Sequence, residues 1–71
     1  METVIAKVID ILGGREAVRE RYGQKYLSSI SNWIRNDRFP EYLHHRIARD
    51  MSDRGYDFDP ETNVLEARDA A

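Results

Sequence analysis

The segment REAVRERYGQKYLSSISNWIRNDR, residues 15–38, decides the fold. Its pattern predicts a short helix from residue 15 to about residue 22, which Gly23 ends because glycine readily adopts the left-handed conformation of a helix end. A longer helix is expected to follow over about residues 27–36. Two short helices joined by a tight glycine turn indicate a helix-turn-helix, in which the second helix is set at a steep angle to the first.

The second helix of this pair has two contrasting faces. Its apolar side is predicted to contain Leu27, Ile30, Trp33 and Ile34, against which the first helix buries Ala17, Val18 and the ring of Tyr22. Its opposite side carries Ser28, Ser31, Asn32 and Arg35. These positions follow the spacing i, i+3, i+4, i+7, so their side chains form one stripe along the helix.

The residue types of this stripe suit the edges of DNA bases. Arginine pairs with O6 and N7 of guanine, asparagine pairs with N6 and N7 of adenine, and serine serves either base. A stripe of this kind taken alone is typical of a solvated helix face. Two features favour base reading: the stripe contains no carboxylate although acids outnumber bases in the chain, and Ser and Asn are mediocre helix formers. We therefore predict that Ser28, Ser31, Asn32 and Arg35 read bases.

Residues around the stripe are candidates for binding the DNA backbone. They are Arg15 at the start of the first helix, Gln24 and Lys25 in the turn, and Arg38 just past the second helix. Contacts to phosphates carry no sequence information, but they position the reading helix.

The flanking sequence predicts further short helices. Thr3 can cap a helix that ends at Gly13, and Pro40 can open a fourth helix that ends near Gly55. Residues 56–59 alternate between aromatic and acidic and suit a short extended segment, while residues 60–68 suit a last short helix with the final few residues frayed. The expected fold is all-α, a small bundle of four to five short helices. The expected organisation is a helix-turn-helix domain over 1–55 and an acidic C-terminal extension over 56–71.

The net charge of −2 does not by itself exclude a nucleic-acid partner, because the charge is unevenly distributed. Residues 1–54 hold ten Lys and Arg against eight Asp and Glu, a net charge of +2. Residues 55–71 hold one Arg against five acids, a net charge of −4. The local field governs the encounter with DNA, so a basic face remains compatible with an acidic chain.

Several classes of function are disfavoured by the composition. The 71 residues include no cysteine, which excludes disulfides and thiolate metal sites. No apolar run approaches the roughly 20 residues that span a bilayer, and no signal peptide is visible, so we expect a cytoplasmic protein without a membrane partner. His44 and His45 are adjacent on a helix and do not face each other, so we expect a partly buried His44 beside a solvated His45 rather than a metal site. We expect no cofactor, no small-molecule substrate and no enzymatic activity.

The chain resembles the Cro-type repressors of temperate phages and the related Cro-like antitoxin regulators. The resemblance covers residues 8–50 and is carried by VIDILGGREAV, Gly23, SSISNWIR and FPEYLHHRIA. Its most specific element is Ile-Ser-Asn-Trp at 30–33 with Pro40 seven residues beyond the tryptophan. It implies that the polar stripe faces the major groove with Trp33 in the core. The stretch from Gly23 to residue 30 is one residue longer than the usual pattern, and Arg19 stands where alanine is common.

These features predict a sequence-specific, DNA-binding transcriptional repressor that binds a palindromic operator as a homodimer. One short helix reads few base pairs, and a second half-site multiplies the discrimination. The expected dimer surface lies on the fourth helix and residues 56–58, where aromatic side chains lie outside the helix-turn-helix. The alternative is a protein-interaction module, an adaptor or inhibitor on the same helical fold, which the acidic tail would suit.

Overall fold

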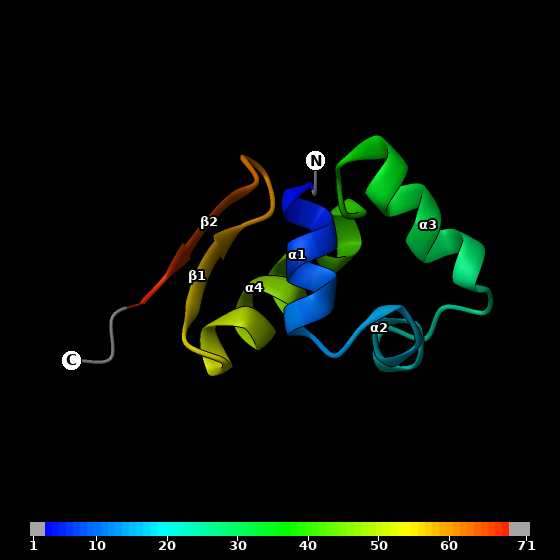
Figure 1. The fold of residues 1–71 in the computed structure, drawn as a ribbon, viewed down its shortest axis with the longest axis horizontal. Helices are drawn as coiled ribbons and strands as arrows, with labels where there is room; N and C mark the ends of the chain where they lie inside the picture. Colours follow the sequence, from blue (N-terminus) through cyan, green and yellow to red (C-terminus); the bar gives the residue numbers. More distant parts are fainter. Residues whose placement is uncertain (1–2, 69–71) are drawn as a thin grey trace.

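The computed structural model describes residues 3–68 and contains helices and a small sheet (Figure 1). The elements in chain order are α1 (Val4–Ile11), α2 (Arg15–Arg21), α3 (Leu27–Asn36), the 3-10 helix η1 (Glu41–Leu43), α4 (His44–Asp53), β1 (Tyr56–Asp59) and β2 (Val64–Ala67). The fold is therefore α+β, and the expectation of an all-α bundle was wrong. The final residues expected to fray fall at 69–71, outside the described range.

The helix ends follow local chemistry. Thr3 caps α1, with its Oγ1 accepting a hydrogen bond from the amide of Ala6 at 3.1 Å. The helix ends before Gly13, whose φ is +113°. A Cβ atom at Gly13 would lie 3.0 Å from the Cβ of Ala17, so a side chain there would crowd the start of α2 as well as strain the backbone. The predicted starts and ends of the first three helices are confirmed.

The core lies between the helices and one face of the hairpin formed by β1 and β2. Its buried apolar residues are Ile5, Val8, Ile9, Leu12, Val18, Tyr22, Ile30, Trp33, Phe39, Leu43, Ile47, Met51 and Phe58. Trp33 is 9% exposed, which confirms its predicted place in the core. Phe39 joins the helices to the hairpin, since its ring meets Trp33 at 5.7 Å and Phe58 at 5.9 Å between centroids, both edge-on.

The segment after Gly55 folds as an antiparallel hairpin, so the helix expected over 60–68 is not formed. In β1 the alternation was interpreted correctly, because Phe58 points into the core while Asp57 and Asp59 are exposed. Asp59 stabilises the turn that follows β1: its Oδ1 accepts a hydrogen bond from the amide of Glu61 at 3.0 Å. Pairing of Phe58 with Leu65 and of Asp57 with Glu66 then satisfies the backbone in place of a helix.

The hairpin turn is tied to the end of α3. Asp37 ends α3 in the left-handed conformation, with φ 54°, and its carbonyl accepts a hydrogen bond from Nδ2 of Asn63 at 2.7 Å. Asn63 itself has φ 59° in the hairpin turn. Asn and Asp are the residues other than glycine that tolerate this conformation best. The C-terminal hairpin thus helps to fix the end of α3.

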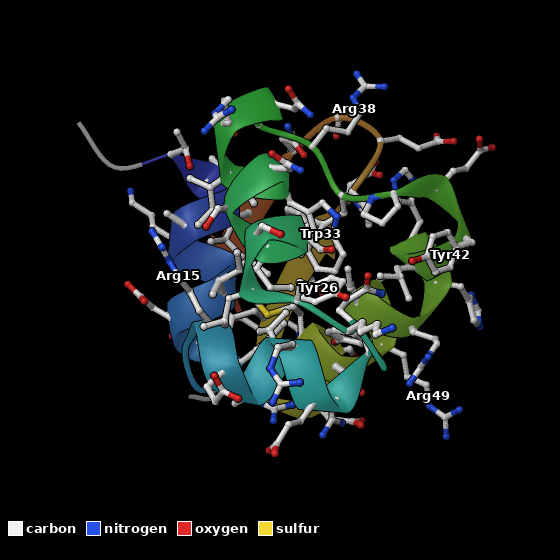
Figure 2. All side chains as sticks on the ribbon, turned by 90° about the vertical axis from the view of Figure 1, so that its right-hand side faces the viewer. Arg15, Tyr26, Trp33, Arg38, Tyr42 and Arg49 are labelled. Carbon is white, nitrogen blue, oxygen red and sulfur yellow. The ribbon has the colours of Figure 1, made fainter. Side chains whose placement is uncertain are left out.

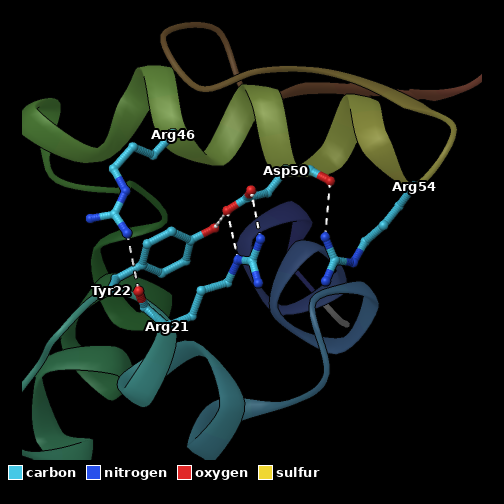
Figure 3. Close-up of polar contacts among 5 residues, drawn as sticks. All are labelled: Arg21, Tyr22, Arg46, Asp50 and Arg54. Carbon is cyan, nitrogen blue, oxygen red and sulfur yellow. Dashed lines mark hydrogen bonds and ion pairs between the residues drawn. The ribbon is translucent and has the colours of Figure 1, made fainter.

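A cluster of hydrogen bonds joins α2 to α4, and we call it the polar clasp (Figure 3). Its members are Arg21, Tyr22, Arg46 and Asp50. The guanidinium of Arg21 donates two hydrogen bonds of 2.8 Å to the carboxylate of Asp50, and the hydroxyl of Tyr22 donates a third of 2.6 Å. Arg46 lies over the Tyr22 ring at 5.1 Å and donates to the Arg21 carbonyl at 3.1 Å. The Arg21 guanidinium, with help from Tyr22, lowers the pKa of Asp50 to about 2. Burial, followed by the bond to Asp50, raises the pKa of Tyr22.

This clasp makes the stability of the fold depend on pH in the acid range. Because the pKa of Asp50 is lower in the folded chain than its ordinary 3.8, its stabilising contribution is complete above that value and is lost as pH falls toward 2. Arg21 is partly exposed and solvent screens the pair, so we expect a loss of about 1–2 kcal/mol in the free energy of unfolding. Urea denaturation at pH 6, 4 and 2.5 measures this loss in the free energy of unfolding. The Asp50→Asn variant should have a lower free energy of unfolding than the wild-type protein at pH 6, and this free energy should fall less on acidification. The Asp53→Asn variant should match the wild-type protein at each pH.

Candidate nucleic-acid interface

The helix-turn-helix is formed by α2 and α3, which pack directly against each other. Val18 and Ile30 are fully buried between them and the rest of the core. Gly23 has φ +67° in the turn, where a residue with a side chain would be strained. In Figure 1, α2 is seen almost end-on while α3 runs across the view, so the two helices cross steeply, as the sequence predicted. This crossing leaves the outer face of α3 uncovered.

That outer face carries the predicted stripe. Ser28, Asn32 and Arg35 are exposed, and Ser31 is partly buried. Nη1 of Arg15 lies 3.5 Å from the Oγ of Ser31, so the start of α2 reaches across to the middle of α3. The structure therefore brings the stripe and one of its proposed phosphate ligands together on one surface.

The other predicted phosphate ligands surround the stripe. Figure 2 looks onto α3 and shows Arg15 on one side of the helix and Arg38 beyond its C-terminal end. Lys25 is exposed in the turn, with Nζ 5.5 Å from the centroid of the Tyr26 ring. Gln24 is half-buried: its Nε2 donates to the Tyr22 carbonyl at 3.1 Å and to the Tyr42 hydroxyl at 3.0 Å. Gln24 thus links the turn to Tyr42 in η1, because its amide nitrogen donates both of these hydrogen bonds within the chain.

The cations of this surface form no ion pairs, which is also true of Lys7, Arg46, Arg49 and Arg54 elsewhere in residues 3–68. Within residues 3–68 the ion pairs join Arg19 to Glu16 and Glu20, Arg21 to Asp50, and Arg68 to Asp57. The cations around α3, which are Arg15, Lys25, Arg35 and Arg38, belong to none of these pairs. Their charge is therefore not neutralised by a neighbouring carboxylate and is available to an anionic partner.

Sequence reasoning missed an apolar part of the same surface. Tyr26, Leu27 and Tyr42 are exposed, although Leu27 was assigned to the inner face of its helix together with Ile30. That assignment was wrong, because Leu27 is the first residue of α3 and is 45% exposed. The exposure of Tyr42 follows from its place beside the inward-facing Leu43. Its contact with Gln24 joins residues eighteen positions apart, and no local pattern predicts it.

The two histidines differ in burial, and His44 has a structural contact. His44 is partly buried, with Nε2 3.0 Å from the carbonyl oxygen of Phe39, and His45 is exposed, as predicted. Over residues 3–68, no group of three His, Asp or Glu side chains is placed to hold a metal ion. The helices of this part of the chain are also too short and too polar to cross a membrane.

Comparisons with models of protein families, with curated proteins and with solved structures gave no match to this chain. The geometry and charge of the α3 surface are therefore the features that indicate a function.

Proposed function

We propose that this protein is a sequence-specific DNA-binding repressor of the Cro type that reads the major groove with α3. The observation that carries the proposal is the uncovered outer face of α3, where Ser28, Asn32 and Arg35 are exposed in a carboxylate-free stripe. An α-helix fits the major groove, and these side chains match the donor and acceptor patterns of base edges there. Repression would follow from occupying a promoter.

The charge arrangement supports the same proposal. Unpaired cations surround the reading stripe, while Asp57 and Glu66 face each other across the two strands of the hairpin. The strands lie on the side of the molecule away from α3 (Figure 1). An acidic chain can thus approach DNA with its basic face, and its acidic strands would remain in solvent or contact a partner.

We further propose that the protein acts as a homodimer on a palindromic operator, because a ten-residue helix reads only a few base pairs. The dimer surface expected from sequence combined α4 with residues 56–58. Phe58 is 6% exposed and packs on Phe39, so its ring belongs to the core of a single chain. Contact in this region would rest on Tyr56, Asp57 and the exposed side of α4. Sedimentation with and without a palindromic duplex measures the stoichiometry.

One observation favours a second candidate function, a protein-interaction module. An open groove of about 380 Å³ lies between α4 and the hairpin, lined by Ala48, Ser52, Tyr56, Asp57, Phe58, Asp59, Val64 and Glu66. Its acidic rim suits a basic protein segment. A module of this kind would bind its partner through the groove, and its function would require no binding of DNA by α3.

Binding to a pool of random duplexes separates these functions. We expect fluorescence anisotropy to detect binding at low salt and the logarithm of affinity to fall linearly with the logarithm of salt concentration, by about 0.9 for each phosphate neutralised. Lys25→Ala should weaken binding to all sequences alike and reduce that slope by about one per bound chain. Lys7→Ala, an exposed lysine on α1, is the matched control and should leave the slope unchanged. Absence of binding at low salt would contradict the proposed function.

A further inference from the structure

Exposed apolar side chains gather at the N-terminal end of α3. Among residues 3–68, the large hydrophobic side chains that are exposed are Tyr26 at 60%, Leu27 at 45%, Tyr42 at 70% and Val64 at 49%. Single exposed apolar residues are ordinary on a protein surface. Here Tyr26 and Leu27 are adjacent, and Tyr42 is bonded to Gln24 in the turn that leads into the same helix end. Three of the four therefore lie at one place, next to the reading stripe.

Leu27 is the residue of this group that borders the stripe within α3 itself. It lies four residues before Ser31, so its side chain stands one turn before that of Ser31, at the border between the stripe and the apolar side of α3. Burying a leucine side chain stabilises a fold appreciably, yet no neighbour within residues 3–68 covers Leu27 as Ile30 is covered one turn later. An apolar side chain is thus exposed beside a stripe that otherwise consists of hydrogen-bonding groups.

We infer that Leu27 contacts the C5-methyl group of a thymine in the major groove. This inference rests on the proposed function, and it adds the identity of one recognised base. The thymine methyl is the apolar group that the major-groove edges of base pairs present, and side chains near the N-terminus of a recognition helix are those that reach base edges. An apolar protein surface is the competing partner. It would have to cover Arg15 and Lys25 as well, whereas DNA supplies phosphates to both.

Deoxyuridine tests the inference directly, because it pairs like thymidine but lacks the methyl group. A binding site is first selected from a random duplex library with the wild-type protein, and each thymine is then replaced singly by deoxyuridine. At one position we expect the wild-type protein to lose about fourfold in affinity, the value of one methyl group in an apolar contact. Because a dimer places Leu27 in both half-sites, Leu27→Ala should lose about the square of that factor on the thymine duplex, about sixteenfold, and it should bind both duplexes equally.

Two variants serve as controls. Leu27→Met keeps an apolar side chain of similar size and should retain sensitivity to deoxyuridine. Val64→Ala removes an exposed apolar side chain on the hairpin and should also retain it. Thermal melting by circular dichroism establishes that each variant is folded, which we expect for exposed positions.

The possible outcomes separate failure of this inference from failure of the proposed function. If the wild-type protein selects a site but tolerates deoxyuridine at every position, methyl recognition by Leu27 is wrong and DNA binding stands. If Leu27→Ala weakens binding yet keeps full sensitivity to deoxyuridine, Leu27 acts elsewhere and the inference again fails. If Leu27→Ala instead abolishes self-association in sedimentation experiments, the patch is a protein interface. If no duplex is bound at all, the proposed function itself is contradicted.

Discussion

Phe39→Ala should leave about half or more of the molecules unfolded at 25 °C. Phe39 is 1% exposed, and its ring packs edge-on against both Trp33 and Phe58, so it connects α3 with the hairpin. Removing a buried phenylalanine ring costs about 3–5 kcal/mol. A single core in a chain of this size supplies about 3–5 kcal/mol in total, so the substitution removes nearly all of the stability. Far-UV circular dichroism should show loss of helix, with no cooperative urea transition.

Two substitutions serve as controls for the Phe39→Ala variant. Phe39→Leu keeps most of the buried apolar volume and should remain folded at reduced stability. Tyr42→Ala removes an aromatic ring that is largely exposed and should change the free energy of unfolding by about 0.5 kcal/mol or less. A cooperative transition for Phe39→Ala close to that of the wild-type protein would contradict the central place of Phe39 in the core.

The parts of the fold that the sequence predicts are those governed by neighbouring residues. Thr3 caps a helix through the amide three residues away, and Gly23 takes the left-handed conformation between α2 and α3. The predicted bounds of α3 agree with Leu27–Asn36, because its apolar spacing and its flanking turn both act over a few residues. Local chemistry of this kind is present in the printed sequence.

The hairpin was missed because the same local chemistry serves two structures. An aspartate followed by proline and glutamate suits the start of a helix, and it equally suits a turn in which Asp59 binds the amide of Glu61. What decides between them is the pairing of Phe58 with Leu65 and the burial of Phe58 against Phe39. Both are tertiary contacts, which no short window of sequence contains.

The candidate site also has features that local sequence predicts and features that depend on tertiary contacts. The stripe could be predicted because Ser28, Ser31 and Arg35 are related by helical spacing alone. The exposure of Leu27 could not be predicted in this way. Periodicity indicates which side of a helix a residue occupies, but it does not indicate whether neighbouring elements reach far enough along the helix to cover that residue. The reach of Arg15 to Ser31 likewise depends on how α2 crosses α3.

The reading role of α3 predicts a second large effect, on DNA recognition. On a selected duplex, Arg35→Ala should raise Kd by about 5- to 150-fold for each half-site that is read, the range for loss of one bidentate contact to guanine worth about 1–3 kcal/mol. Arg35 is exposed and forms no ion pair within residues 3–68, so its removal should leave the fold intact. Discrimination should be lost at one base position in each half-site and kept at the others. Anisotropy titrations on single-base variants of the duplex measure both quantities.

Replacing Arg35 by lysine separates base reading from simple charge. Arg35→Lys keeps the positive charge but loses the planar fork that pairs with O6 and N7 of guanine. It should therefore bind random duplexes about as well as the wild-type protein while losing preference at the same position in each half-site. Arg54→Ala, an exposed arginine at the end of α4, is the matched control and should retain that preference. If Arg35→Lys selected the same site with the same discrimination, Arg35 would contribute charge alone, and base reading would fall to Ser28, Ser31 and Asn32.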